Sequence, residues 1–253
     1  MTKRAILIGI DSYSNIKPAP RSFKELSPLY GCVRDVKKVQ EILIERWGFR
    51  SEDITMLISP LSEDQALSGN TDQATDLSPS YENIVESINS VLSQSHPKDV
   101  VYIQFSGYVQ TIPTATPHVR KLLSRTEDLA LLPVNLLRDG KCLRDVELAA
   151  LLYRLTANAC EVTIVIDGRS TFARVPQLIA LHRPEIADDE IRAVSYGPWS
   201  AFGQHTWLQN PPPDVPYALF LIEGYFDKAG GPEFRDPNKR AWWLPHTPTS
   251  EAA

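Results

Sequence analysis

The sequence predicts an α/β protein built on a mostly parallel, doubly wound sheet flanked by helices. Three short runs of β-branched and aliphatic residues, at 4–10, 100–105 and 162–166, are typical of strands buried on both faces. Segments with apolar residues at helical spacing lie between them, and alternating strands and helices imply parallel strands with right-handed crossovers. Because ligands bind beyond the carboxyl ends of such strands, the residues that follow these runs are the first candidates for a site.

The first third of the chain contains two predicted strands with a helix between them. The strand at 4–10 leads into a proline-rich loop. From Asp35 onward apolar residues recur at helical spacing, and Gly48 follows the last of them as a C-cap. A short strand is expected at 53–59. The polar stretch 60–80 has no periodicity and is interpreted as a surface loop.

A second helix is expected at 81–92, with Ser80 as its N-cap. The remaining predicted elements follow in this order: a strand at 99–105, a loop at 111–126, an extended piece at 127–134, a helix at 145–155, and strands at 162–166 and 217–223. We expect one domain over 1–253, with a core at 4–175 plus the strand 217–223, while 176–216 and 224–253 are irregular.

Composition excludes several classes of protein. The chain has 253 residues and a net charge of -5, with a pI near 5.6, which argues against a general binder of nucleic acid or of anionic membranes. No apolar run approaches the roughly 20 residues that span a bilayer, and no signal peptide precedes the first strand. The cysteines at 32, 142 and 160 match neither a disulfide framework nor a zinc pattern. A cytoplasmic location is expected.

Five short motifs stand out along the chain: RAILIGI at 4–10 followed by Tyr13, LYGCVRDV at 29–36, WGF at 47–49, FSG at 105–107 and VID at 165–167. In this order and spacing they resemble the caspase-like cysteine peptidases, and within them the metacaspase branch. The resemblance covers roughly residues 4–175, with a weaker echo at 217–223. It implies a caspase-like (caspase-hemoglobinase) fold and the activity of a cysteine-type endopeptidase in proteolysis.

The two positions that carry catalysis in that family are both substituted. Family members place a histidine after the Ser-Gly that follows the third strand, and a cysteine two residues after the aspartate that ends the fourth. In this sequence those positions hold Tyr108 and Arg169. Tyrosine is largely protonated at neutral pH, and arginine is a permanent cation without nucleophilic character. The resemblance therefore implies a catalytically inactive pseudo-peptidase.

The resemblance also implies a substrate-binding pocket for a basic side chain. Its members in the family correspond here to Cys32, Asp35, Ser106 and Asp167, and all four are present. We expect a protein that acts by binding or scaffolding, with a protein or peptide that carries a basic residue as its partner. No cofactor or metal is expected. The acidic pair at 127–128 lies near where some metacaspases gather carboxylates for calcium, which is the alternative.

Other readings of these residues stay open. Asp35 could serve only as a helix cap, Asp167 only as an acceptor for backbone N–H groups, and Tyr108 only in packing. An active endopeptidase that cleaves after Arg or Lys with a relocated nucleophile is the alternative function, with Cys32 as nucleophile and His118 as its partner. A third reading is an α/β domain unrelated to this family.

Arg169 carries one further expectation. Residues two apart on a strand point to the same side, so Asp167 and Arg169 should share a face. We expect the guanidinium to form ion pairs with Asp167 and Asp35 while it stacks on the ring of Tyr108. A solvated surface position for Arg169 is the alternative.

Overall fold

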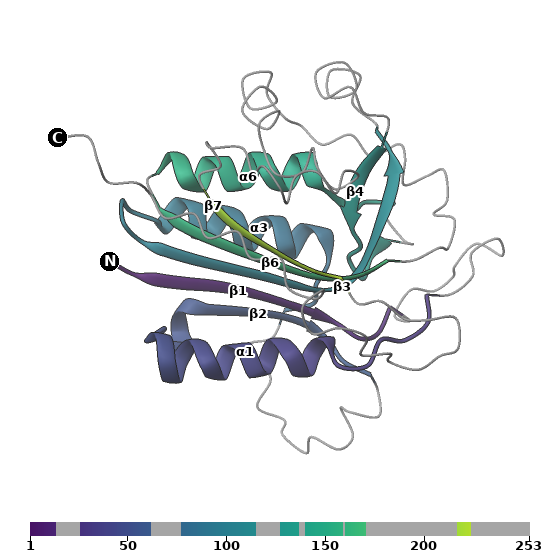
Figure 1. Ribbon diagram of the computed structural model, residues 1–253, viewed down its shortest axis with the longest axis horizontal. Helices are drawn as coiled ribbons and strands as arrows, with labels where there is room; N and C mark the ends of the chain where they lie inside the picture. Colours follow the sequence, from purple (N-terminus) through teal and green to yellow (C-terminus); the bar gives the residue numbers. More distant parts are fainter. Residues whose placement is uncertain are drawn as a thin grey trace.

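Seven strands of the described chain form one sheet, and helices cover both of its faces (Figure 1). The structure is a computed structural model, and it describes residues 1–13, 26–61, 77–114, 127–136, 140–158, 160–170 and 217–223. The elements in chain order are β1 (Lys3–Ile10), α1 (Cys32–Trp47), the short 3-10 helix η1 (Ser51–Asp53), β2 (Ile54–Ser59), α3 (Tyr81–Gln94), β3 (Val100–Pro113), β4 (Glu127–Leu131), β5 (Leu143–Arg144), α6 (Asp145–Ala157), β6 (Glu161–Ser170) and β7 (Tyr217–Glu223).

The expected mostly parallel α/β architecture is confirmed. Strands β2, β1, β3, β6 and β7 are adjacent in that order, and each neighbouring pair is parallel. The far half of β3 pairs antiparallel with β4, which in turn pairs antiparallel with β5. These last two strands form an extension of the sheet that the sequence predicted only in part, since β5 has two residues and no hydrophobic alternation of its own.

Two strands run further than the sequence predicts. The third strand was expected to end at residue 105 and the fourth at 166, yet β3 continues to Pro113 and β6 to Ser170. Their parallel register is unbroken from Val100 opposite Glu161 to Val109 opposite Ser170. The polar and glycine residues that signalled strand ends are therefore inside the sheet, because each strand supplies the other with hydrogen-bond partners along this whole length.

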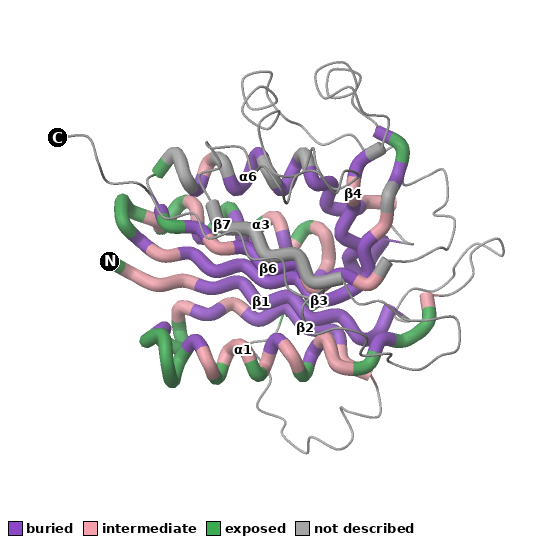
Figure 2. Tube along the Cα trace, viewed as in Figure 1, coloured by how far each residue is buried: buried purple, intermediate pink, exposed green. Residues whose placement is uncertain are grey.

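The core has two layers, one on each face of the sheet. The larger apolar cluster lies between the sheet and helices α3 and α6, while the smaller one lies beneath α1 (Figures 1 and 2). Strands β1, β3 and β6 are buried over most of their length in Figure 2. Because all three described α-helices begin at the carboxyl edge of the parallel strands, their N-termini and the strand ends share one side of the molecule (Figure 1).

Helix ends test the cap predictions. Ser80 caps α3 as expected, because its Oγ accepts a hydrogen bond from the backbone N–H of Asn83 at 3.2 Å. Gly48 ends α1 in the left-handed conformation, with φ of 69°, also as expected. The start of α1 is different: the helix begins at Cys32, so Asp35 lies within its first turn and is not its cap. No helix of the described residues is long and apolar enough to cross a membrane.

A buried ion pair joins β4 to β5 within the antiparallel extension. Arg144 Nη1 lies 2.7 Å from Asp128 Oδ2, and both side chains are fully excluded from solvent. Arg144 also donates to the carbonyl oxygen of Pro113 at 3.0 Å, and the Thr114 hydroxyl donates to Asp128 at 2.9 Å. The Asp128 carboxylate, which belongs to the acidic pair considered above for calcium, is thus engaged by a guanidinium and a hydroxyl.

Replacing Arg144 by methionine is expected to lower the free energy of unfolding by roughly 3–5 kcal/mol, because the Asp128 carboxylate would be left buried without its cation. The double replacement Arg144→Met with Asp128→Leu should recover much of that loss. Lys38→Met is the control: it breaks the exposed Lys38–Glu41 pair, which solvent screens, and should leave the free energy of unfolding almost unchanged. Urea unfolding measures all three, and a double variant no more stable than Arg144→Met would contradict the account.

A second buried acid lies where α3 meets α6. Glu147 is 9% exposed, its Oε1 accepts a hydrogen bond from the hydroxyl of Tyr81, and its Oε2 has no hydrogen-bond partner among the described residues. Burial raises the pKa of Glu147 to about 7, against the opposing effect of the Tyr81 hydroxyl and of the Arg144 backbone N–H. One hydrogen-bonded oxygen suits a neutral carboxyl group better than a carboxylate.

This environment predicts a stability that depends on pH. The folded protein holds the Glu147 proton more tightly than the unfolded chain, so the free energy of unfolding should fall as pH rises from about 4.5 to about 7. The loss should be on the order of 2–3 kcal/mol. Glu147→Gln should flatten this part of the profile, whereas Glu41→Gln on the exposed face of α1 should not. An unchanged pH profile in Glu147→Gln would refute the assignment.

Candidate functional site

The candidate residues come together at the carboxyl edge of the sheet, on the face covered by α1. Strand β3 contributes Ser106 and Tyr108, and β6 contributes Asp167 and Arg169. The register sets Ser106 opposite Asp167 and Tyr108 opposite Arg169. The first turn of α1 adds Cys32 and Asp35. Three elements far apart in the sequence therefore meet here.

Four of these residues form what we call the acidic cluster: Cys32, Asp35, Ser106 and Asp167. The hydroxyl of Ser106 donates to Asp167 Oδ2 at 3.3 Å. The Ser106 hydroxyl also lies close enough to the Cys32 sulfur to interact with it, and Asp35 is close enough to Asp167 to repel its charge. The geometry thus brings together the four residues that the resemblance assigned to a pocket for a basic side chain.

The two carboxyl groups of the acidic cluster differ in exposure. The Asp35 side chain is 48% exposed and lies 3.4 Å from the guanidinium of the exposed Arg34. Asp167 is more deeply placed: burial raises its pKa, the charge of Asp35 raises it further, and the hydrogen bond from Ser106 opposes both. A partly desolvated acid beside a second acid is stabilised by any cation that enters between them.

Arg169 does not supply that cation. Its guanidinium lies over the ring of Tyr108, with Cζ 5.9 Å from the ring centroid, so the expected stacking is confirmed. The ion pairs among the described residues include none between Arg169 and Asp35 or Asp167, and the pKa of Asp167 is raised rather than lowered. The expectation of an ion pair was therefore wrong. Arg169 lies one side-chain pair further along the strands, about 6.6 Å beyond Asp167, where the Tyr108 ring holds it.

Tyr108 is built into the structure on three sides. Its backbone N–H donates to the hydroxyl of Tyr13 at 2.8 Å, and the two rings pack with centroids 5.3 Å apart. Its own hydroxyl donates to the carbonyl oxygen of Ser27 at 3.0 Å. Gly107 makes this approach possible, because a Cβ at that position would lie 2.8 Å from the Tyr13 hydroxyl. At the histidine position the chain thus has a buried packing residue.

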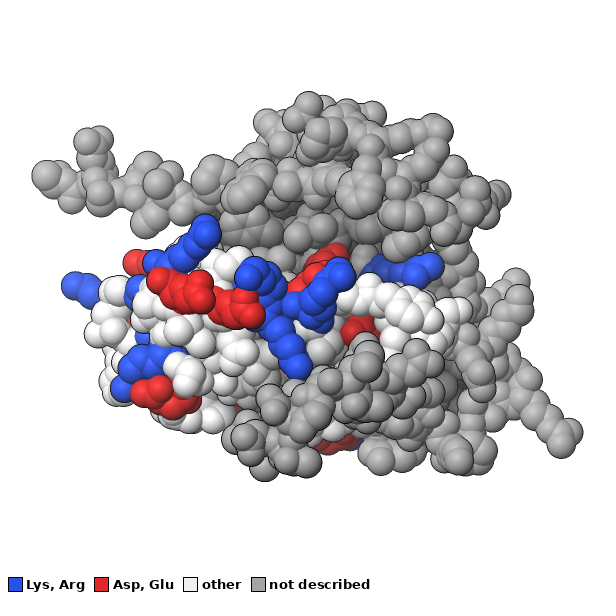
Figure 3. Space-filling model, turned by 90° about the horizontal axis from the view of Figure 1, so that it is seen from below, with Lys and Arg blue, Asp and Glu red and all other residues white. Residues whose placement is uncertain are grey.

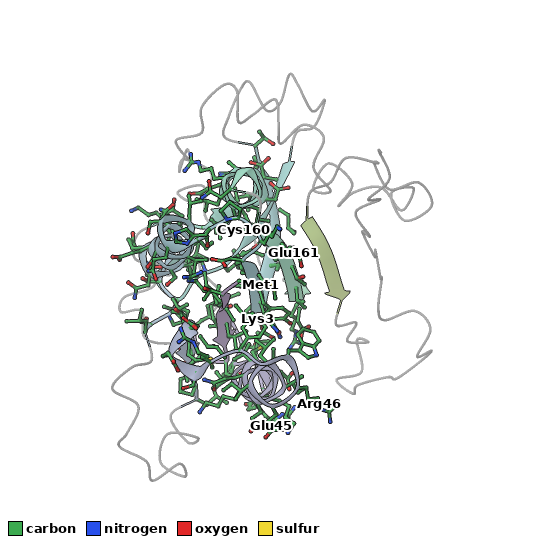
Figure 4. The ribbon with its side chains drawn as sticks, turned by 90° about the vertical axis from the view of Figure 1, so that its left-hand side faces the viewer. Met1, Lys3, Glu45, Arg46, Cys160 and Glu161 are labelled. Carbon is green, nitrogen blue, oxygen red and sulfur yellow. The ribbon has the colours of Figure 1, made fainter. Side chains whose placement is uncertain are left out.

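The thiol of Cys32 is poorly suited to nucleophilic attack. Burial raises the pKa of Cys32 to about 12, and the charges of Asp11 and Asp167 add to the effect, although the interaction with Ser106 opposes it. His118, the partner considered for it, lies outside the described residues. Cys160 is at the opposite, amino edge, near Lys3 and Glu161 (Figure 4), where its thiol donates to the His96 carbonyl oxygen at 3.6 Å.

One site residue was missed by the sequence analysis. Asp11 follows β1 directly and is 3% exposed. Its carboxylate accepts hydrogen bonds from the backbone N–H groups of Gly31, Cys32 and Val33, at 3.1, 2.8 and 3.3 Å. The signal was available, since an acid directly after a buried strand stands at the functional edge of the sheet.

The described residues contain no group suited to hold a metal ion, and on the face that carries α1 they form no area of a single charge sign (Figure 3). No group of three or more His, Cys, Asp and Glu side chains among them could hold a metal ion. On the face that carries α1, acidic and basic side chains are interspersed (Figure 3). The charge that distinguishes the site is therefore local to the acidic cluster.

Comparison of the sequence with known proteins identifies a family. Residues 3–173 match the model described as metacaspase, peptidase C14 domain. Arabidopsis thaliana metacaspase-7 is 32% identical over 116 residues, which cover 46% of this chain and 23% of the relative. Arabidopsis thaliana metacaspase-8 is 26% identical over 168 residues, which cover 66% of this chain and 36% of the relative.

Two further matches cover different shares of the chain. Metacaspase-1 of Schizosaccharomyces pombe is 26% identical over 42% of this chain and 20% of its own length. A Geobacter sulfurreducens protein of known crystal structure has a TM-score of 0.48 at 17% identity, covering 90% of this chain and 74% of that one. The chain spans between about a fifth and about a third of the length of these metacaspases. Because the family model covers well over half of the chain, and the strands it covers have the expected order, the chain belongs to the metacaspase family and carries its peptidase C14 domain.

Proposed function

We propose that this metacaspase-like domain is a pseudo-peptidase that binds a basic side chain of a protein or peptide partner. The observation that carries the proposal is the pair at the two dyad positions, where the Tyr108 ring packs against the Arg169 guanidinium. A peptidase of this class needs a thiolate and a group that moves protons. A permanently charged guanidinium and a phenol buried beneath it supply neither.

A relocated nucleophile is not favoured by the surroundings of Cys32. With a pKa of about 12, only about one molecule in 10⁵ would carry the thiolate at pH 7. Reactive cysteines have lowered pKa values and cationic neighbours, whereas Cys32 has Asp11 and Asp167 beside it. The same carboxylates that suppress its ionisation suit the acidic cluster for a cation.

The acidic cluster offers a basic side chain two complementary groups. Asp167 is half-buried and hydrogen-bonded to Ser106, and Asp35 faces it from α1. An arginine fork can pair with a carboxylate through two hydrogen bonds, and its charge would offset the repulsion between the two acids. Since binding a cation requires Asp167 to be ionised, affinity should rise with pH through the titration of Asp167.

The purified protein is expected to release no product from fluorogenic peptides that end in arginine or lysine, with or without calcium. Without an assembled nucleophile and base, turnover should lie several orders of magnitude below that of an active cysteine peptidase, about 10⁴-fold or more. Turnover that survives purification and disappears in Cys32→Ala would instead establish the alternative, an active endopeptidase with Cys32 as its nucleophile.

Asp167→Asn is expected to weaken binding of an acetylated arginine peptide by about tenfold or more, as a charge-assisted pair is worth roughly 1.5–3 kcal/mol. The same change should raise thermal stability at pH 7, because the raised pKa of Asp167 means that its ionised form costs stability in the empty fold.

Glu41→Gln is the matched control for Asp167→Asn, since it removes one negative charge from the exposed face of α1. Isothermal titration and thermal melts give both readouts. Equal peptide affinities in wild type, Asp167→Asn and Glu41→Gln would show that the acidic cluster is not the binding site.

A further inference from the structure

Helix α1 depends on a residue outside itself for its N-terminal cap. Gly31 precedes the helix with φ of 124° and provides no side chain to accept a hydrogen bond. Asp11, which lies at the end of β1 and twenty residues before Gly31, instead accepts hydrogen bonds from the N–H groups at the start of the helix. Its Oδ1 accepts from the backbone N–H groups of Gly31 and Cys32, and its Oδ2 accepts from that of Val33. A negative charge at this end also complements the helix dipole.

Asp11 is itself fixed by its backbone. Its N–H donates to the carbonyl oxygen of Ser59 at the end of β2 at 2.9 Å, and its carbonyl oxygen accepts from the N–H of Leu29 at 2.8 Å. The next residue, Ser12, also bonds to Ser59, with 3.0 Å between its N–H and the Ser59 carbonyl oxygen. The carboxylate therefore extends from a point that two strand ends hold in place.

Helix α1 also lies very close to β1 at this level. A Cβ at Gly9 would lie 2.9 Å from the carbonyl oxygen of Cys32 and 2.6 Å from a methyl carbon of Val36. The first turn of α1 therefore packs closely against β1 on one side and is capped by the Asp11 carboxylate at its end. Cys32 and Asp35, the two α1 members of the acidic cluster, lie within that turn.

We propose that Asp11 is the positioning residue of the acidic cluster, holding the first turn of α1 so that Cys32 and Asp35 face Ser106 and Asp167. This inference rests on the proposed function for its binding readout only. Asp11 does not touch the basic ligand; it acts through three backbone N–H groups. It also accepts a hydrogen bond from the Cys32 thiol and repels the thiolate, which keeps that cysteine protonated.

Asparagine and alanine at position 11 separate positioning from charge. Asp11→Asn keeps one oxygen that can accept from Gly31 and Cys32, whereas Asp11→Ala removes every acceptor. Positioning predicts that Asp11→Ala weakens binding of an acetylated arginine peptide by about tenfold, while Asp11→Asn loses clearly less. If only the charge mattered, both variants would lose affinity equally. Equal losses, or wild-type affinity in Asp11→Ala, would overturn the proposal.

Ser80→Ala is the matched control, because Ser80 caps α3 and does not contact the acidic cluster. All variants are titrated at a temperature where each is folded, and Ser80→Ala should bind the peptide like wild type. If Ser80→Ala weakened binding as much as Asp11→Ala does, the effect of Asp11 would be one of general stability, and the inference would be overturned.

A second readout needs no ligand and stands if the proposed function fails. Alkylation of Cys32 by iodoacetamide between pH 8 and 10, followed by peptide mass spectrometry, reports how firmly the first turn of α1 is held and how far the thiol is kept protonated. Asp11→Ala, which frees the first turn, should raise this rate about tenfold. Asp11→Asn, which keeps only one of the two acceptor oxygens, should raise it less, and Ser80→Ala should leave it unchanged. An unchanged rate in Asp11→Asn overturns the proposal even if Asp11→Ala does not fold. Absence of peptide binding by wild type, with the rate increase present, overturns only the proposed function.

Discussion

The in-register pairing of β3 with β6 decides which side chains are neighbours at the carboxyl edge. Ten consecutive residue pairs, from Val100–Glu161 to Val109–Ser170, are held by one continuous ladder. Two of these pairs carry the chemistry: Ser106 with Asp167, and Tyr108 with Arg169. A shift of β6 by one residue against β3 would send Asp167 and Arg169 to the opposite face of the sheet. The composition of the site is therefore a consequence of strand pairing, and α1 adds its two residues to a surface that the sheet has already set.

Within that surface, two neighbouring pairs have opposite character. Ser106 and Asp167 form a polar pair joined by a hydrogen bond. Among the described residues, no cation forms an ion pair with the Asp167 carboxylate. Tyr108 and Arg169 form a closed pair in which an aromatic face meets a guanidinium. The separation explains why the arginine can replace the family's cysteine without filling the acidic cluster. The two positions that differ from the family's pattern thus lie beside the acidic cluster and not within it.

Much of the fold was predictable because its signals are local. The buried runs of β1, β3 and β6, the Ser80 cap and the Gly48 C-cap each depend on residues within a few positions of one another. The true ends of β3 and β6 were not predictable, because Ser106-Gly107 and Asp167-Gly168 signal a turn in isolation and pair only with each other. The start of α1 was missed for the same reason. Its cap is Asp11, 21 residues before Cys32, and no local pattern connects the two.

The site was predictable as a set of residues but not as a set of contacts. The family motifs identified Cys32, Asp35, Ser106 and Asp167, and the structure brings them together. Motifs could not indicate whether Arg169 pairs with an acid or with a ring, since Asp167 and Tyr108 are both within reach of a long side chain. That outcome depends on a spacing of one residue pair along the strand, which only the register specifies.

The contacts that Tyr108 makes limit which residues can replace it without loss of stability. A histidine at this position would return a group that moves protons, yet it would give up the phenol hydroxyl that bonds to Ser27 and the wide ring that supports Arg169. A cysteine at position 169 would in turn leave that ring without its cation. Either substitution alone should therefore lower the stability of the fold. Under the proposed function, the contact between Tyr108 and Arg169 would oppose any single substitution that restores one member of the catalytic pair.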